Sequence, residues 1–117
     1  MKPVRFVGSF RDDLAAFPKS ARARAGYELF MVQVGRDPDN WKPMAGAGVG
    51  TCEIRVRDPT GAHRVIYVAK FADAVYVLHA FCKKTQKTAR ADLDLAKQRY
   101  RIARELAEGV NHAKESD

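Results

Sequence analysis

The chain has 117 residues, the length of one ordinary domain, so two domains with separate cores are effectively excluded. Its 21 Lys and Arg against 14 Asp and Glu give a net charge of +7, which favours a partner rich in negative charge, nucleic acid before anionic lipid. The longest apolar stretch, residues 74–82, is far shorter than the roughly 20 residues of a membrane helix, so no transmembrane span is expected. The two cysteines, Cys52 and Cys82, and the lack of a secretion signal predict reduced thiols and a cytoplasmic location.

The first third of the chain predicts a short strand followed by a helical hairpin. Residues 4–6 read as the strand, and Ser9 is a cap for a first helix that ends at Phe17, because Pro18 disfavours helical geometry in the residue before it. A second helix is expected from Pro18 to Gly35, with an apolar stripe at Ala21, Ala25, Leu29 and Val32. Residues 36–50 are dense in Gly, Pro, Asp and Asn, which predicts a loop.

The remaining residues predict three strands and a final helix. Residues 51–57 alternate between apolar and polar side chains, residues 58–61 have turn chemistry, and residues 63–71 resume the extended pattern, which together indicate a hairpin. Residues 74–82 are apolar on both faces, as in an interior strand. Thr88 can cap a helix whose apolar stripe is Leu93, Ala96, Tyr100, Ala103 and Leu106.

These elements predict an α+β fold in the order β-α-α-β-β-β-α. We expect a small, mainly antiparallel sheet of about four strands, with the helices gathered at one side of it. The domain is expected to span residues 1–109. Residues 110–117 have no apolar periodicity, which predicts a frayed tail.

Motifs for metal or nucleotide binding are missing from the sequence. The three histidines and two cysteines have no metal-ligand spacing, and the glycine-rich residues 46–50 open a strand instead of a helix, so no cofactor is expected. Alternation places His79 on one strand face with Val75, Val77 and Phe81, which favours a structural histidine over a catalytic one.

Basic side chains from separate segments carry the main chemical signal. Arg55 and Arg57 lie on the polar face of one strand, Arg64 begins the next, and Lys83 with Lys84 ends the third, so adjacent strands can bring them to one phosphate. Arginine binds two phosphate oxygens at once, and a lysine among cations can transfer protons. Such a set suffices for cleavage of RNA, whose own 2′-hydroxyl is the nucleophile, without a metal. By spacing alone, passive RNA binding is favoured over catalysis.

A second basic region covers residues 83–104, with eight basic and two acidic side chains. A solvated helix face explains such a run as well as RNA binding does. The RNA-binding candidates, together with Arg57, are Lys87, Arg90, Lys97, Arg99 and Arg101.

Five segments together resemble the phage-derived branch of the RelE/HigB toxin superfamily, in the right order from about Val4 to Arg104. They are Phe17-Pro18, Lys42-Pro43-Met44-Ala45-Gly46, Glu53-Ile54-Arg55, His63-Arg64-Val65-Ile66-Tyr67 and, most specific, residues 77–88 with the run His79-Ala80-Phe81-Cys82-Lys83-Lys84. The resemblance implies a RelE-like fold and the toxin of a type II toxin-antitoxin pair. Such a toxin is a metal-independent endoribonuclease that cuts messenger RNA, commonly on the ribosome, and is silenced by a small antitoxin, usually of helix-turn-helix type.

Position by position, the resemblance assigns Arg55, Arg64 and either Lys83 or Lys84 to the catalytic site. Arg64 matches the arginine that holds the scissile phosphate. Two departures leave the proton-transfer residue open: Glu53 stands where RelE has a lysine, and the RelE tyrosine beyond the last strand has no counterpart in residues 85–92. Since HigB-like members use other residues there, including histidine, His79 stays a possible site residue.

Two alternatives remain at this point. A degenerate toxin that binds RNA or antitoxin without cleaving RNA would explain both departures. A phage accessory protein is the third reading, because relatives are carried on prophages.

Overall fold

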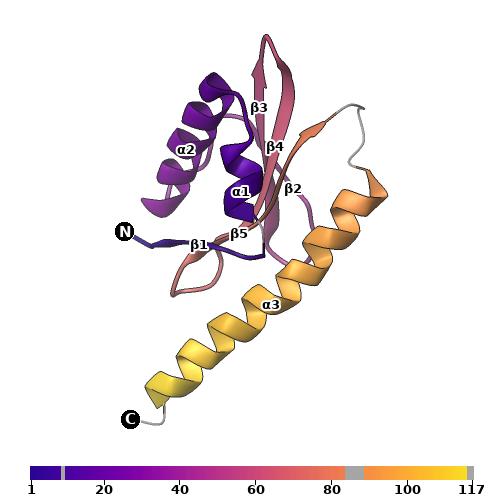
Figure 1. Cartoon of the computed structure of the whole chain (residues 1–117). Coiled ribbons are helices and arrows are strands. Elements are labelled where there is room, and N and C mark those ends of the chain that lie inside the picture. Colours follow the sequence, from indigo (N-terminus) through magenta and orange to yellow (C-terminus); the bar gives the residue numbers. More distant parts are fainter. Residues whose placement is uncertain (9, 84–88, 116–117) are drawn as a thin grey trace.

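Five strands and three helices form the part of the chain that the computed structural model describes, residues 1–8, 10–83 and 89–115 (Figure 1). In chain order the elements are β1 (Val4–Phe6), α1 (Phe10–Ala15), α2 (Lys19–Gln33), β2 (Trp41–Pro43), β3 (Thr51–Asp58), β4 (Gly61–Val68), β5 (Val75–Lys83) and α3 (Arg90–Glu115). The predicted α+β class is confirmed. The predicted count of about four strands is wrong by one, because β2 lies inside the segment expected to be a loop.

The sheet has the strand order β1-β5-β4-β3-β2. β1 pairs with β5 in parallel and the other neighbours are antiparallel, so the sheet is mainly antiparallel as predicted. β2 pairs with β3 through Trp41 opposite Ile54 and Lys42 opposite Glu53. Pro43 can end this strand because β2 lies at the sheet edge, where a missing backbone donor costs little.

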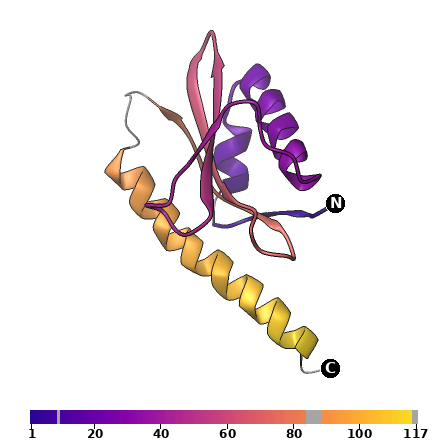
Figure 2. The same ribbon diagram turned by 180° about the vertical axis from the view of Figure 1, so that it is seen from behind.

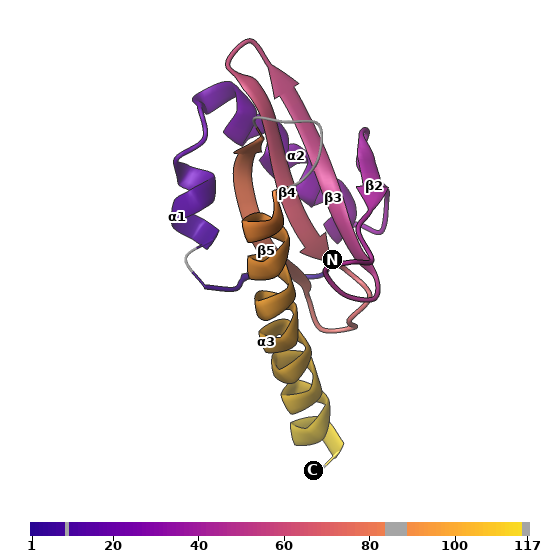
Figure 3. The same ribbon diagram turned by 90° about the vertical axis from the view of Figure 1, so that its right-hand side faces the viewer.

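The helices cover both faces of the sheet, which corrects the expectation that they gather at one side. Figure 3 shows α3 in front of the sheet and α2 behind it. The core under α2 contains Ala21, Ala25, Leu29, Ile54, Val65, Val75 and Val77, and the core under α3 contains Ile66, Val68, Tyr76, Leu78, Ala96, Tyr100 and Ala103. A strand that is apolar on both faces, such as β5, must be covered from both sides.

An irregularity in β5 changes the face of His79. The pairing with β4 shifts between Ile66, opposite His79, and Tyr67, opposite Val77, so that Leu78 is an extra residue. A bulge of this kind interrupts the alternation of side chains along a strand. His79 therefore shares a face with Phe81, whose ring stacks on it at 4.9 Å between centroids, but not with Val75 and Val77 as predicted.

Helix α3 follows the predicted stripe over its first half and then departs from it. Leu93, Ala96, Tyr100 and Ala103 pack on the sheet, but Leu106 is 43% exposed and Ala107 takes the buried position. The helix continues past Gly109 to Glu115, where the sequence pattern predicted an irregular tail. Figure 2 shows its C-terminal part extending beyond the sheet. Across the described residues, no helix combines the length and the hydropathy needed to cross a membrane.

Candidate functional site

Strand pairing brings basic side chains of four strands onto one face of the sheet. Arg55 lies opposite Arg64 across β3 and β4, Lys42 lies opposite Glu53 across β2 and β3, and Lys83 lies opposite Ala62 across β4 and β5. Directly opposed residues of an antiparallel pair share a face, here the face of Ile66 and Val68, on which α3 packs. We call Lys42, Arg55, Arg57, Arg64 and Lys83 the basic cluster. It occupies the half of the sheet next to the 58–61 turn, which projects away from α3 in Figure 1.

One carboxylate lies inside the basic cluster. Glu53 is 0% exposed, and its Oε1 lies 3.4 Å from Nε of Arg64 and 3.5 Å from Nε of Arg55. A buried carboxylate needs paired charges to offset its lost hydration, and the two arginines provide them. Glu53 thus links neighbouring strands β3 and β4 through their charged side chains.

Buried hydrogen-bond donors of the cluster remain without acceptors among the described residues. Arg64 is 5% exposed and Lys83 is 8% exposed. Neither Nε of Arg64 nor Nζ of Lys83 makes a hydrogen bond to any described group, although Nη1 of Arg64 donates to the carbonyl of His63 at 3.2 Å. Arg64 Nε still has its ion pair with Glu53, whereas the Lys83 ammonium has no acceptor among the described residues. Buried donors in proteins are nearly always paired, so this ammonium in a cationic cluster favours the binding of an anion.

The surroundings of Lys83 lower the pKa of its ammonium. Loss of hydration lowers the pKa of its ammonium, and the nearby charges of Arg64, Lys42 and Arg55 lower it further, while Glu53 acts in the opposite direction. Burial also lowers the pKa of Arg64, but a guanidinium keeps its proton in any protein setting. The cluster therefore offers fixed positive charge from arginine and an exchangeable proton from lysine.

The predicted catalytic residues divide into those that converge and those that cannot be placed. Arg55, Arg64 and Lys83 lie in the cluster with Arg57, whose charge acts on Arg64. Lys84 and Lys87 lie outside the described residues, as do the helix caps expected at Ser9 and Thr88.

His79 belongs to a different polar group. Its Nε2 lies 2.7 Å from the Asp92 carboxylate of α3, and its Nδ1 lies 4.0 Å from Asp13 of α1. The imidazole is 7% exposed. It lies between α1 and α3 in the middle of β5, and these are contacts that a structural histidine makes.

The predicted RNA-binding residues of α3 have two kinds of surroundings. Arg90, Lys97 and Arg101 are exposed, and Arg90 lies 3.8 Å from Asp94 on the same helix. Arg99 is 8% exposed, donates from Nη1 to the carbonyl of Leu78 at 2.9 Å and lies beside Asp13. Arg99 therefore points inward and is not part of the exposed basic face.

Two members of the site were missed as candidates. Lys42 joins the cluster only through the pairing of β2 with β3, which the loop prediction omitted. Trp41, a residue favoured in strands, followed by a proline that suits an edge strand, was the available signal. The alternation of residues 51–57 put Glu53 on the same polar strand face as Arg55, but Glu53 was treated as a departure from RelE and not as a site residue.

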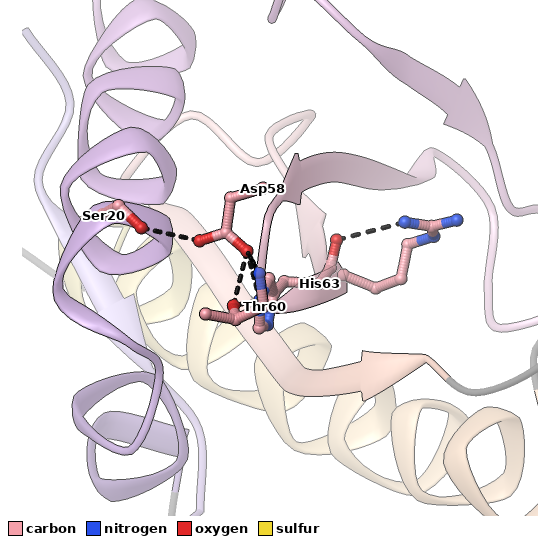
Figure 4. Close-up of polar contacts among 5 residues, drawn as sticks. Ser20, Asp58, Thr60 and His63 are labelled. Atoms are coloured by element: carbon pink, nitrogen blue, oxygen red, sulfur yellow. Dashed lines mark hydrogen bonds and ion pairs between the residues drawn. The ribbon is translucent and has the colours of Figure 1, made fainter.

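A second polar cluster holds the β3–β4 turn against α2 (Figure 4). Oγ of Ser20 donates to Asp58 at 2.6 Å, the backbone N–H of Thr60 donates to Asp58 at 2.9 Å, and Nε2 of His63 lies 3.4 Å from the same carboxylate. The Phe17 ring packs on His63 at 4.8 Å. These contacts join α2 to the hairpin that presents Arg55 and Arg64.

Within the described ranges, no group of three or more His, Cys, Asp and Glu side chains is arranged to hold a metal ion.

The family model of the phage-derived Gp49-like proteins matches residues 12–101, a span that includes the whole basic cluster. No curated protein matches the chain at a significant level. Membership of a phage-derived family, which the sequence implied, is thereby confirmed, and assignment to the HigB branch remains a prediction.

Proposed function

We propose that this chain, which belongs to the phage-derived Gp49-like family, is the toxin of a type II toxin-antitoxin pair and cleaves messenger RNA as an endoribonuclease. The single observation that carries the proposal is the buried ammonium of Lys83, which has no hydrogen-bond acceptor among the described residues, beside the arginines of the basic cluster. One RNA phosphate would supply an acceptor for Lys83 and a further anionic partner for Arg64.

The chemistry follows from the charges of the cluster. The 2′-oxygen of RNA attacks the adjacent phosphorus, a bond to the 2′-oxygen forms, and the bond to the 5′-oxygen breaks. Arg55 and Arg64 neutralise the negative charge that grows on the phosphate oxygens in this step. Lys83, whose pKa is lowered by burial, gives its proton to the leaving 5′-oxygen, and the proton of the 2′-hydroxyl passes to solvent.

The partners follow from charge and from the family resemblance. A net charge of +7 suits binding to the ribosome and its messenger RNA, because phosphate neutralisation releases counterions. We propose a small antitoxin, of helix-turn-helix type, as the protein partner that silences the enzyme.

Expression of the chain without an antitoxin tests the proposal. We expect arrested growth and cleaved transcripts, and Arg64→Ala should lower the cleavage rate by about 100-fold or more, because it removes a fixed charge from the reacting phosphate. Arg64→Lys keeps the charge without the two-oxygen geometry and should recover only part of the rate. Arg36→Ala is the matched control, because Arg36 is exposed and lies outside the cluster.

Circular dichroism must show that each variant is folded. A folded wild-type chain that leaves growth and transcripts unchanged contradicts the enzyme proposal. Retained RNA binding in that case favours the degenerate toxin, for which the buried acid Glu53 in the cluster is the supporting observation. Loss of both activities favours a phage accessory role.

A further inference from the structure

Glu53 is a costly residue at its position unless it serves the basic cluster. Its partner on the neighbouring strand β4 is Ile66. An apolar side chain at position 53 would therefore suit the same sheet face, and no charged group would lose its hydration on burial. The carboxylate is instead fully buried among cations.

Glu53 contacts both arginines at Nε, the nitrogen nearest the aliphatic stem, at 3.5 Å for Arg55 and 3.4 Å for Arg64. Nη1 of Arg64 also donates to the carbonyl of His63 at 3.2 Å. The terminal nitrogens, which bind two phosphate oxygens at once, extend farther along each side chain. An arginine held at Nε has lost much of its rotational freedom before substrate arrives, so less entropy is lost in the transition state.

The negative charge of Glu53 also affects the two states of the substrate unequally. A phosphodiester carries one negative charge in the ground state and gains charge in the pentavalent transition state. By lowering the net positive charge of the cluster, Glu53 weakens binding of the phosphodiester in the ground state. The aligned guanidinium groups still stabilise the negative charge that the phosphate gains in the transition state. Only interactions that strengthen in the transition state accelerate the reaction.

From these contacts we infer that Glu53 is a positioning residue, which orients Arg55 and Arg64 toward the scissile phosphate and weakens ground-state binding of RNA. This inference rests on the proposed function. It assigns a role to the residue by which the chain departs from RelE.

Glu53→Gln tests the inference, with Glu28→Gln as the matched control. Glu28 is also a buried glutamate. It lines a cavity together with Arg55 and Arg57, but its carboxylate is paired with Arg24 at 2.9 Å and accepts from the backbone N–H of Asp39, so its loss removes a nearby negative charge without removing the contacts at Nε of Arg55 and Arg64. We expect Glu53→Gln to bind a 2′-O-methylated, uncleavable RNA oligonucleotide several-fold more tightly than wild type, and to cleave the matching 2′-hydroxyl RNA at least tenfold more slowly. Glu53→Asp, which keeps the charge on a shorter stem, should restore part of the rate.

Opposite changes in binding and turnover identify a positioning role. If Glu53 only dilutes positive charge, the glutamine variant binds more tightly and cleaves at least as fast as wild type. If Glu53 only stabilises the fold, binding, turnover and melting temperature all fall together. Either result overturns the inference.

An NMR titration of the Lys83 side chain gives a readout that needs no cleavage. The charged groups that face Lys83 are Arg64 of β4, Glu53 and Arg55 of β3, and Lys42 of β2. Since Glu53 is the anion among them, its loss should make the Lys83 ammonium lose its proton at a lower pH. The limb of the cleavage profile that falls as pH rises should move to lower pH by the same amount.

The RNA assays and the Lys83 titration together distinguish failure of the inference from failure of the proposed function. If the wild-type chain cleaves no RNA, the enzyme proposal fails, and the Lys83 titration still decides whether Glu53 controls the charge of the cluster. If the Lys83 titration and the RNA affinity of Glu53→Gln equal those of wild type, the inference is wrong even when wild type cleaves RNA.

Discussion

Two carboxylates on the same strand, Glu53 and Asp58, have opposite surroundings. Asp58, at the turn, is contacted by the hydroxyl of Ser20, by Thr60 and by His63. Glu53, five residues earlier, is contacted by two arginines and lies near further cations. The partners of Asp58 are mostly neutral donors, whereas positive charges outnumber the acid around Glu53.

The contrast separates a structural polar cluster from a candidate site. Hydrogen bonds from Ser20 and Thr60 stabilise the ionised form of Asp58 and hold its pKa well below the usual range. Around Glu53, the buried ammonium of Lys83 remains without a hydrogen-bond acceptor among the described residues. An excess of buried cations over acids therefore indicates a ligand of negative charge, and a balanced group does not.

The largest effect is expected for Lys83→Met. Cleavage should fall by about 100-fold or more, because the proton donor of the leaving oxygen is lost. Stability at neutral pH should hold or rise, because an ammonium with no hydrogen-bond partner in the described part of the chain is replaced by an apolar side chain of similar length. RNA cleavage assays and urea unfolding of both proteins measure the two effects.

The pH dependence of stability provides the control for Lys83→Met. The folded pKa of Lys83 lies below the unfolded value of about 10.4, so the unfolded chain binds more protons between those two values. Wild type should therefore gain stability as pH rises through that window, and Lys83→Met should lack the gain. A variant that is less stable at every pH contradicts the view that this ammonium is poorly compensated.

An intermediate effect is expected for Asp58→Asn, on stability alone. Because the folded pKa of Asp58 is lowered, its contribution is present above the ordinary value of about 4 and is lost as pH falls below it. The variant should melt a few degrees lower than wild type at pH 7, and the difference should shrink below about pH 4. Thermal unfolding across this pH range measures it. A variant that keeps its stability but loses RNA cleavage would place Asp58 in the site and contradict its assignment to a structural cluster.

The smallest effect is expected from the exposed basic face of α3. Removing Lys97 and Arg101 together should reduce the slope of log affinity against log salt by about 2 at most, because each exposed cation neutralises at most one phosphate. Arg99→Met, on the same helix, should leave that slope unchanged and lower the melting temperature, because Arg99 donates to the Leu78 carbonyl inside the fold. An unchanged slope for the double variant would show that Lys97 and Arg101 contact solvent and not RNA phosphates.

Features that depend on neighbouring residues were predicted from the sequence. The stripe of Ala21, Ala25, Leu29 and Val32 marked α2, and the turn chemistry of residues 58–61 marked the hairpin of β3 and β4. The register of a hairpin follows from its turn, so the pairing of Arg55 with Arg64 could also be predicted from the sequence. Helix periodicity and turn chemistry are local properties, which is why they can be read along the chain.

Other features were decided by contacts between distant segments. The pairing of β2 made Lys42 part of the cluster, and the bulge at Leu78 moved His79 away from the face of Val75 and Val77. Arg99 was indistinguishable from Lys97 by composition, yet it turned inward to a backbone carbonyl of β5.

The sequence by itself determined the α+β class, the elements of the hairpin and the excess of positive charge, because these depend on composition and short-range pattern. Only the tertiary structure decided that helices cover both sheet faces and that Glu53 lies at the centre of the cations, because strand order and burial arise from packing between residues far apart in the chain.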